Sequence, residues 1–394
     1  MGVMPFGRLG TAFAACLAAA TMAGSVAAED GVSQDKIVLG QVAALDGPAA
    51  ELGLGMRQGL AAAFAEANRA GGVKGRKIEL VSVNDGYEPD QSIVAARQLI
   101  NEDKVFALIG SVGTPTSAAV EPIAAETGVP LIGAFTGAEF LRTPYKPNVI
   151  NIRASYFQET ETMVEHLTKE LGAKRIAIFY QDDAFGQAGL AGVKRALEKR
   201  GMALVAEGTY ERNTTAVKGA LLSIEKGAPD AVIMIGAYAP CAEFIRLARA
   251  MNLHAAFVNI SFVGSEALAK ALGPAGAGVI VTEVVPFPQD GAIPIVAQYL
   301  RALKAADANA QPGYVSLEGY VAGRVFLALA AKIPGEVTRA ALIDAEAKSG
   351  GIDLGGIKLT YGPADNHGSD RVYLTVIRAD GSLRPVETLA GIGG

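Results

Sequence analysis

Short apolar runs alternate with longer amphipathic stretches along the chain from residue 36 onward. The apolar runs have the length of strands and cover residues 37–42, 78–83, 105–109 and 129–132. The stretches between them have the spacing of helices and cover residues 52–70, 89–101 and 115–127. Because strands that are apolar throughout are covered on both faces, the alternation predicts a parallel sheet with helices on each side.

The same alternation begins again near residue 157. Helices are predicted at 157–171, 185–200, 215–226 and 239–251. Strands are predicted at 175–180, 203–208, 231–235, 257–260 and 279–282. Two series of this kind predict an α/β protein with two doubly wound parallel-sheet lobes. Ligands of such sheets bind beyond the carboxyl ends of the strands, so a cleft between the lobes is the expected site.

The last part of the chain has helical spacing at 293–306, 314–331 and 336–348, with strand-like runs at 357–360 and 371–377. Periodicity alone does not assign these elements to either lobe. The Asn-His-Gly segment between Asp365 and Asp370 is predicted to be a plain loop.

Residues 1–28 are typical of a secretory signal peptide. Arg8 precedes an apolar run at 9–22, and small residues at 25–28 offer a cleavage site. The run is shorter than the ~20 apolar residues that a membrane-spanning helix needs. The sequence therefore predicts an exported chain that is released from the membrane, with residues 29–394 as the mature protein.

Composition narrows the range of partners. The 35 Lys and Arg residues against 40 Asp and Glu residues give a formal net charge of −5, so no basic surface for nucleic acid is expected. Cys241 is the only cysteine after residue 28, which excludes an intramolecular disulfide in the mature chain. Stability must therefore come from hydrophobic cores.

No motif in the sequence marks a catalytic centre. G-x-S-x-G, phosphate-loop and H-E-x-x-H patterns are absent, and His166, His254 and His367 have no second metal-type ligand at helical spacing. Asp182 and Asp183 follow a strand and are predicted to cap a helix. We expect no catalytic residue, no cofactor and no metal ion.

Loops that follow the strands carry the candidate ligand contacts. After the third strand, Thr114 is predicted as the N-cap of a helix, with Pro115 at its first position. Free N–H groups there, with the Thr114 hydroxyl, can receive a carboxylate, and ordinary capping is the alternative explanation. The Gly-rich loop at 133–137, Phe185 and Tyr238 also follow strands, which favours a pocket with apolar walls.

Six segments carry a resemblance to a known family. They lie at 37–48, 68–75, 84–90, 109–116, 175–186 and 236–240, and include Asn84-Asp-Gly-Tyr-Glu-Pro-Asp90. In this order the chain resembles periplasmic solute-binding proteins of ABC importers, in particular the leucine/isoleucine/valine-binding group. The resemblance covers nearly all of the mature chain. It implies the type I periplasmic binding protein fold, in which two lobes are joined by a three-crossover hinge.

The resemblance also implies a domain division and a working motion. The first lobe would consist of residues 29–152 plus 284–373, and the second of residues 153–283 plus 374–394. Hinge motion would close the lobes around a ligand, and a membrane permease would recognise the closed form. The protein is expected to be a periplasmic monomer.

The family's ligand contacts, carried over by position, fall on Leu52, Thr114, Phe135, Thr136, Gly137, Phe185, Tyr238 and Ser261. Tyr156 is a further expected wall of the same pocket. Leu52 is smaller than the family's aromatic residue, and Phe185 lacks a tyrosine hydroxyl. Ser261 stands where the family has the acidic residue that binds the ammonium of an amino acid.

Ser261 leaves the ligand class open, because an ammonium buried without a carboxylate partner is costly. Either Asp182, Asp183 or Glu266 supplies the acid, or the ligand is a non-amino aromatic or aliphatic carboxylate. The expected function is capture of a hydrophobic, branched-chain type amino acid for an ABC importer. The alternatives are uptake of a non-amino aromatic or aliphatic carboxylate, a sensory ligand-binding protein and an exported enzyme.

Overall fold

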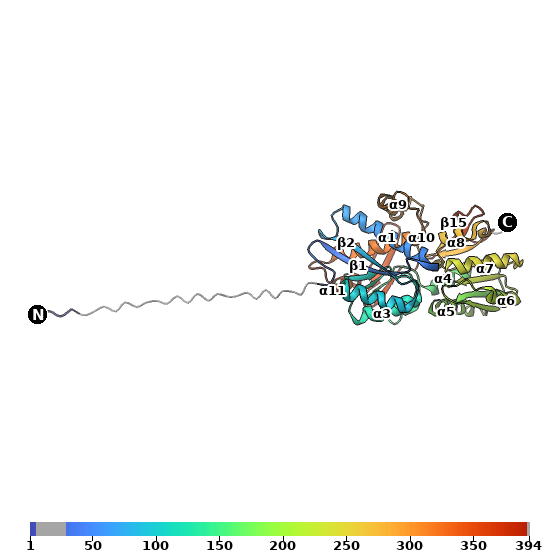
Figure 1. Ribbon diagram of the computed structural model, residues 1–394, viewed down its shortest axis with the longest axis horizontal. Helices are drawn as coiled ribbons and strands as arrows, with labels where there is room; N and C mark the ends of the chain where they lie inside the picture. Colours follow the sequence, from blue (N-terminus) through green and yellow to red (C-terminus); the bar gives the residue numbers. More distant parts are fainter. Residues whose placement is uncertain (5–28, 392–394) are drawn as a thin grey trace.

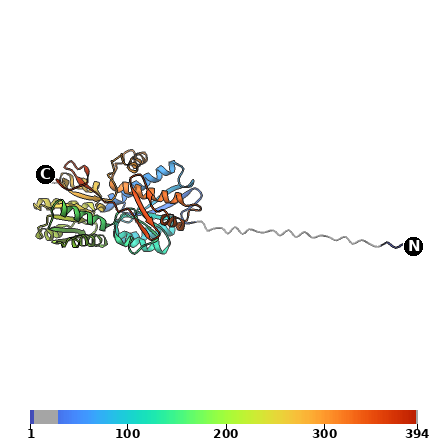
Figure 2. The same ribbon diagram turned by 180° about the vertical axis from the view of Figure 1, so that it is seen from behind.

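Two α/β lobes lie side by side in the computed structural model, which describes residues 1–4 and 29–391 (Figure 1). The predicted signal peptide lies outside the described residues apart from residues 1–4. Seen from behind, late segments of the chain contribute to both lobes (Figure 2). The lobes are therefore not two consecutive halves of the sequence.

The first lobe is built on a five-stranded sheet with the order β2-β1-β3-β4-β5, and every neighbouring pair is parallel. Its strands are β1 (Lys36–Ala43), β2 (Lys77–Asn84), β3 (Ala107–Ile109), β4 (Leu131–Ile132) and β5 (Val149–Ile150). They are connected by α1 (Ala50–Arg69), α2 (Pro89–Arg97) and α3 (Thr114–Glu126). Strand β5 has two residues, which is too short to give a pattern in the sequence.

Three later helices complete the first lobe (Figure 1). They are α9 (Pro294–Ala306), α10 (Tyr314–Lys332) and α11 (Arg339–Ala347). A Cβ atom on Gly59 of α1 would lie 1.9 Å from the carbonyl oxygen of Ser316, so glycine allows α1 and α10 to pack closely. Helix α10 is long and apolar enough to cross a membrane, but 78% of that segment is buried, as in a core helix.

The second lobe has a seven-stranded sheet with the order β15-β14-β10-β9-β8-β6-β7. Its parallel strands are β6 (Ile176–Gln181), β7 (Ala206–Tyr210), β8 (Ala231–Ile235), β9 (Ala256–Asn259) and β10 (Ile280–Glu283). Strands β14 (Tyr373–Ile377) and β15 (Leu383–Val386) are antiparallel to their neighbours. The helices are α4 (Tyr156–Lys169), α5 (Ala184–Glu198), α6 (Lys218–Lys226), α7 (Tyr238–Ala250) and α8 (Ser265–Leu272). The predicted fold class, two doubly wound lobes of the type I kind, is confirmed.

The predicted loop between Asp365 and Asp370 is wrong, because Asp365–Gly368 forms strand β13. It pairs with β12 (Lys358–Gly362), which pairs with β11 (Ile352–Asp353) in a small antiparallel sheet. The side-chain amide of Asn366 donates to the carbonyl oxygens of Leu141 and Val149, each at 3.1 Å. These contacts with a distant segment fix the strand, and local sequence does not reveal them.

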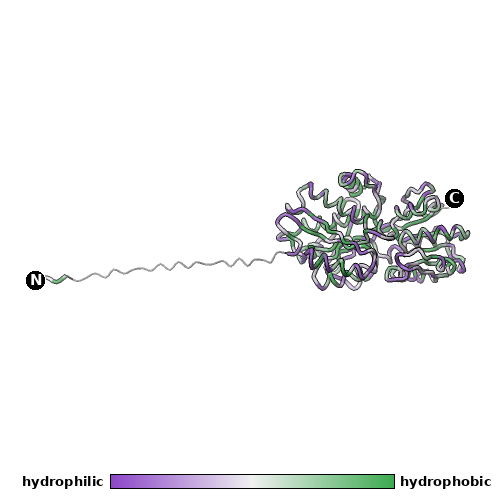
Figure 3. The backbone as a smooth tube through the Cα atoms, viewed as in Figure 1, coloured by the Kyte–Doolittle hydropathy of each residue, from purple (hydrophilic) through white to green (hydrophobic). Residues whose placement is uncertain are grey.

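Hydrophobic residues lie mainly in the interior of both lobes, and hydrophilic residues lie mainly on the outside (Figure 3). One buried cluster joins the lobes. Tyr87 follows β2 in the first lobe, and Phe185 and Phe262 follow β6 and β9 in the second, and all three belong to this cluster. The lobes therefore meet at the carboxyl ends of their strands, where a ligand is expected.

Candidate functional site

The predicted ligand contacts lie where the two lobes face each other. Leu52, Phe135, Tyr156 and Phe185 belong to one buried hydrophobic cluster, and the partly exposed Tyr238 packs against it. The cluster draws these residues from loops and helix starts of both lobes. The structure thus brings together the apolar contacts that the sequence predicted, while their role in ligand binding stays a prediction.

Three hydroxyl groups meet at the start of α3. The Thr114 and Thr136 hydroxyl oxygens are 2.6 Å apart, and the Thr136 oxygen is 3.4 Å from the Tyr156 hydroxyl. The Thr136 oxygen also accepts a hydrogen bond from the backbone N–H of Ala138 at 3.2 Å. We call Thr114, Thr136 and Tyr156 the hydroxyl cluster.

The prediction that Thr114 caps α3 is wrong. The N-cap is Gly113, whose φ of 108° suits glycine, and no side chain caps the helix. Because Gly113 occupies that position, the Thr114 side chain turns to Thr136 instead. The N-terminus of α3 therefore keeps N–H groups that no side chain satisfies, next to the hydroxyl cluster.

Gly137 allows the loop after β4 to lie against the start of α4. The backbone N–H of Tyr156 donates to the Gly137 carbonyl oxygen at 2.7 Å. A Cβ atom on Gly137 would lie 2.6 Å from the Tyr156 ring. Ser155 and Gln158 form a capping box that starts α4 at this point. Glycine at 137 therefore brings the Tyr156 hydroxyl close to Thr136.

Aromatic rings from both lobes pack together next to the hydroxyl cluster. The Phe262 ring centroid lies 4.6 Å from that of Phe185, 5.3 Å from that of Phe135 and 5.8 Å from that of Tyr87. The Tyr156 and Phe185 centroids are 5.5 Å apart. The sequence prediction did not include Tyr87 and Phe262, although Phe262 directly follows Ser261.

A buried group of charged residues adjoins these rings. The Arg153 side chain is 1% exposed, and its guanidinium carbon lies 4.8 Å from the centre of the Phe135 ring. Its Nη2 atom donates to the Ser261 hydroxyl and lies 3.6 Å from Glu159, while Nε lies 3.5 Å from Glu318. We call Arg153, Glu159, Ser261 and Glu318 the charged cluster.

Ser261 is bound to an acid from a neighbouring helix. Its hydroxyl donates to one Glu159 carboxylate oxygen at 2.9 Å, and its backbone N–H donates to the other at 3.0 Å. The Thr282 hydroxyl donates to Glu159 at 2.6 Å. The carboxylate nearest to Ser261 therefore comes from α4 and already accepts three hydrogen bonds.

Burial shifts the pKa values in the charged cluster. Burial alone would lower the pKa of Arg153, but the charges of Glu318 and Glu159 outweigh it, so the pKa rises and the guanidinium stays protonated. Burial raises the pKa of Glu318 to about 7, although Arg153 opposes the shift. Burial also lowers the pKa of Arg142 to about 10, and its Nη2 donates to the Arg153 carbonyl oxygen at 2.9 Å.

The acids proposed as substitutes at position 261 are engaged elsewhere. Asp183 caps α5 by accepting from the Phe185 N–H at 2.9 Å, as predicted, and also pairs with Arg212 at 2.9 Å. Asp182 is exposed. Glu266 accepts from the Tyr314 N–H at 3.0 Å, and burial raises its pKa to about 7. None of these three carboxylates forms a hydrogen bond with Ser261: Asp183 and Glu266 bind other groups, and Asp182 is exposed.

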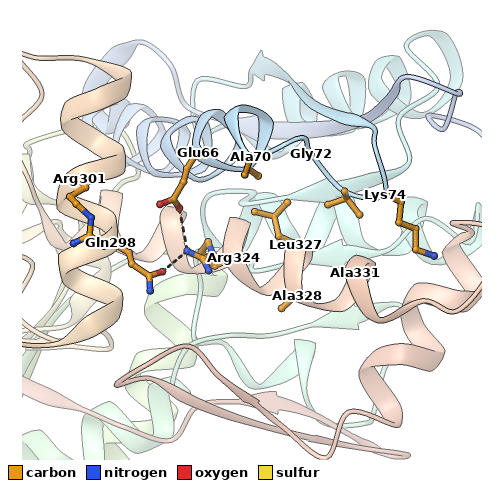
Figure 4. A pocket seen from close by; sticks show the side chains of 12 residues that line it. Glu66, Ala70, Gly72, Lys74, Gln298, Arg301, Arg324, Leu327, Ala328 and Ala331 are labelled. Carbon is orange, nitrogen blue, oxygen red and sulfur yellow. Dashed lines mark hydrogen bonds and ion pairs between the residues drawn. The ribbon is translucent and has the colours of Figure 1, made fainter.

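Open hollows in the surface lie beside the predicted site and away from it. One of about 460 Å³ lies between the lobes and is lined by Leu52, Gly264 and Glu266 among others. Another of about 770 Å³ lies on the first lobe between α1, α9 and α10 (Figure 4). Arg324 in this hollow is bound to Glu66 at 3.2 Å and to Gln298 at 2.6 Å.

Metal-ligating side chains and the single thiol are further reactive groups among the described residues. Over residues 1–4 and 29–391, the structure has no group of three or more His, Cys, Asp or Glu side chains that would hold a metal ion. Cys241 is buried as a free thiol, and burial raises its pKa.

The fold and the site between its lobes define a solute-binding protein of the two-lobed class. The profile of the family described as "Periplasmic binding protein" matches residues 36–382, and the chain belongs to this family. The resemblance inferred from the sequence segments is confirmed.

Relatives and solved structures agree with this family. The chain is similar to Leu/Ile/Val-binding protein homolog 3 of Brucella melitensis biotype 1, at 28% identity over 298 residues, 73% of this chain and 78% of that protein. It is similar to a possible leucine/isoleucine/valine-binding protein from Rhodopirellula baltica SH 1, with a TM-score of 0.87, 37% identity and coverage of 94% and 100%. It shares its fold with a fatty acid ABC transporter substrate-binding protein from Thermomonospora curvata, with a TM-score of 0.83, 22% identity and coverage of 92% and 95%.

The sequence prediction missed the ionic members of the charged cluster. Glu159 lies on the buried face of α4 with Tyr156 and Met163, and Glu318 lies among the buried residues of α10. A carboxylate inside an apolar helix stripe signals a buried ionic partner, because an isolated buried charge is costly. That signal is visible in the sequence, but the partner Arg153 is not.

Proposed function

We propose that this chain captures a small carboxylate with an apolar body between its lobes and delivers it to an ABC permease. The observation that carries the proposal is the hydroxyl cluster at the uncapped start of α3, facing aromatic rings from both lobes. A helix N-terminus attracts an anion through its free N–H groups and its dipole. Hydroxyl groups add donors, and the rings favour an apolar body that is removed from water.

Contacts between the lobes support a mechanism of hinge closure. Arg212 of the second lobe pairs with Glu88 of the first at 2.8 Å, and Asn213 donates to the same carboxylate at 2.7 Å. The Gln181 side-chain amide donates to the Tyr87 hydroxyl at 3.2 Å. In the proposed cycle these contacts form when the lobes close and break when they open. The crossovers near residues 153, 284 and 374 act as the hinge.

Two ligand classes fit the proposed site. A branched-chain type amino acid is supported by the names of relatives such as the Leu/Ile/Val-binding protein homolog of Brucella melitensis. A non-amino aromatic or aliphatic carboxylate is supported by Ser261, whose nearest acid already accepts three hydrogen bonds. The proposal includes export directed by residues 1–28, a periplasmic location, a monomer and no catalysis.

A thermal-shift screen followed by calorimetry tests the proposal. The screen covers branched-chain and aromatic amino acids together with aliphatic and aromatic acids. We expect at least one carboxylate to raise the melting temperature, and Thr114→Ala and Tyr238→Ala each to weaken its binding while the protein stays folded. If no carboxylate binds, or if both variants bind it with unchanged affinity, the proposal is wrong.

A further inference from the structure

We infer that Arg153 binds the ligand directly and that the ligand presents an acceptor oxygen, and no ammonium, to this guanidinium. The inference rests on the proposed function and narrows its ligand class to acids without an amino group, such as 2-oxo acids. It arises from the unused hydrogen-bonding capacity of Arg153, from its position beside the predicted contacts and from the charges around it.

Arg153 has more donors than the described residues satisfy. A guanidinium carries five N–H donors and accepts none. Its Nη2 atom donates to Ser261, and Nε has only the ion pair with Glu318 at 3.5 Å, without a hydrogen bond. Within the described part of the chain Nη1 has no hydrogen-bond partner. A buried donor without a partner costs about 1–3 kcal/mol, and more when it is charged. An acceptor supplied by a ligand would remove that cost.

The guanidinium adjoins the predicted binding residues. Its central carbon lies 4.8 Å from the centre of the Phe135 ring and 6.0 Å from that of Tyr156. Ser261, its hydrogen-bond partner, is followed by Phe262, whose ring contacts Phe185. Arg153 therefore stands among residues from both lobes that are expected to surround the ligand.

The charges around Arg153 favour an anion over an ammonium. Both Glu159 oxygens are occupied by hydrogen bonds from Ser261 and Thr282. The carboxyl of Glu318 is partly protonated at neutral pH because burial raises its pKa to about 7. A third buried acid, Glu283, also acts on Arg153, but burial raises its pKa well above the ordinary value, which favours its neutral form. Arg142 adds a second buried positive charge. An ammonium placed here would face like charges, whereas a carbonyl or carboxylate oxygen would accept from Arg153.

A matched pair of ligands separates these alternatives. Leucine and 4-methyl-2-oxopentanoate have the same carboxylate and the same side chain, and differ only in an ammonium or a carbonyl oxygen at C2. Calorimetry with the full mature chain should give a dissociation constant at least about tenfold lower for the oxo acid, the effect of about one charge-assisted hydrogen bond. Equal affinities, or tighter binding of leucine, would overturn the inference while leaving the proposed function intact.

Failure of the broader proposal looks different. If neither probe binds, 3-phenyl-2-oxopropanoate and phenylalanine form a second matched pair with a larger apolar body. If the oxo acid of this pair binds and phenylalanine does not, the inference stands. If no carboxylate of the whole screen binds, both the proposed function and the inference fail.

Two variants test the role of Arg153 itself. Arg153→Gln combined with Glu318→Gln removes the cation and an adjacent carboxylate together, so that no new unpaired charge arises from this pair. We expect the preference for the oxo acid over leucine to fall by about tenfold, whereas Glu318→Gln alone should keep it. An unchanged preference in the folded double variant would show that Arg153 is only structural.

A variant at position 261 keeps the test valid if the double variant does not fold. Ser261→Asp places a second carboxyl beside Nη2 of Arg153 and next to Glu159, where it offsets the positive charge and competes with the ligand for the guanidinium donors. Binding of the oxo acid should weaken by about tenfold, so the preference for the oxo acid over leucine should decrease. Circular dichroism confirms folding. An unchanged preference for the oxo acid over leucine in the folded variant would overturn the inference.

Discussion

The two polar regions of the site, the hydroxyl cluster and the charged cluster, are built in different ways. The hydroxyl cluster is uncharged, and its members bond one another at 2.6 and 3.4 Å. The charged cluster joins residues far apart in the chain. Among the described residues Arg153 has no hydrogen-bond partner for Nη1, and Nε has only the ion pair with Glu318. The hydroxyl groups already bond one another, whereas Arg153 in the charged cluster still has an N–H donor that lacks an acceptor.

The largest expected effect follows from removing the cation of the charged cluster. Arg153→Met would leave Glu159 and Glu318 buried without their counter-ion. We expect the free energy of unfolding to fall by about 3–5 kcal/mol. Urea denaturation followed by circular dichroism measures the change.

The matched control is Arg195→Met, because Arg195 is exposed and its guanidinium carbon lies 4.9 Å from the centre of the Phe157 ring. This substitution should cost less than about 1 kcal/mol. Similar losses in both variants would show that the charged cluster contributes no more than a surface contact.

The hydroxyl cluster should respond more to ligand than to denaturant. Thr136→Val keeps the shape of the side chain but removes the oxygen that lies near Thr114, Tyr156 and Ala138. We expect the free energy of unfolding to fall by about 1–2 kcal/mol and the affinity for the carboxylate found in the screen to fall about tenfold. Calorimetry and thermal denaturation give the two values.

Thr127→Val serves as its control, since Thr127 is exposed at the end of the same helix and its hydroxyl bonds the Ile123 carbonyl. The affinity of the Thr127→Val variant for the same carboxylate should be unchanged. A Thr136 variant that binds as tightly as this control would remove the hydroxyl cluster from the binding site.

Of the two clusters, only the charged cluster should make stability depend on pH near neutrality. Burial raises the pKa of Glu318 from 4.5 to about 7, so its stabilising contribution is complete below pH 4.5 and is lost as the pH rises through 7. Glu318→Gln stays neutral. The difference in unfolding free energy should therefore shift in favour of this variant by about 1–3 kcal/mol between pH 5 and pH 8.

Urea titrations at several pH values measure this shift, with Glu126→Gln at an exposed position as the control. A constant difference between Glu318→Gln and the natural chain over this range would contradict the assigned protonation of the charged cluster.

The smallest expected effect concerns the edge of the site. Arg212→Ala removes a partly exposed pair that joins the lobes through Glu88 at 2.8 Å. We expect ligand affinity to fall about threefold or less, since such pairs contribute about 0.2–1 kcal/mol. Arg246→Ala breaks a pair with Glu243 within one helix and should leave affinity unchanged. A loss for Arg212→Ala as large as that for Thr136→Val would mean that closure, and not the hydroxyl cluster, dominates binding.

Much of the fold could be predicted from the sequence because its signals are local. Apolar runs predicted β1, β6 and β8, and the predicted helix end at residue 70 lies one residue beyond the end of α1 at Arg69. Strand β13 escaped prediction because Asn366 is held by carbonyl groups of a distant segment. Strand β5 escaped because two residues carry no period.

The site divides in the same way. Thr114 and Phe135 follow strands of the first sheet and Tyr238 follows a strand of the second, so topology brings each of them to the carboxyl edge of its own sheet. The capping role of Thr114 was predicted incorrectly, because Gly113 adopts a conformation that moves the helix start by one residue. Arg153, Glu159 and Glu318 come from three separate segments, and only the folded chain pairs them.

The crystal structure of the protein with the carboxylate that gives the largest thermal shift tests the central claim most directly. We predict that this carboxylate lies between the lobes, within hydrogen-bonding distance of the Thr114 and Thr136 hydroxyls, with its apolar body against Phe135 and Phe185. A carboxylate bound in the hollow between α1, α9 and α10, or between the lobes without contact to either threonine, would contradict the account.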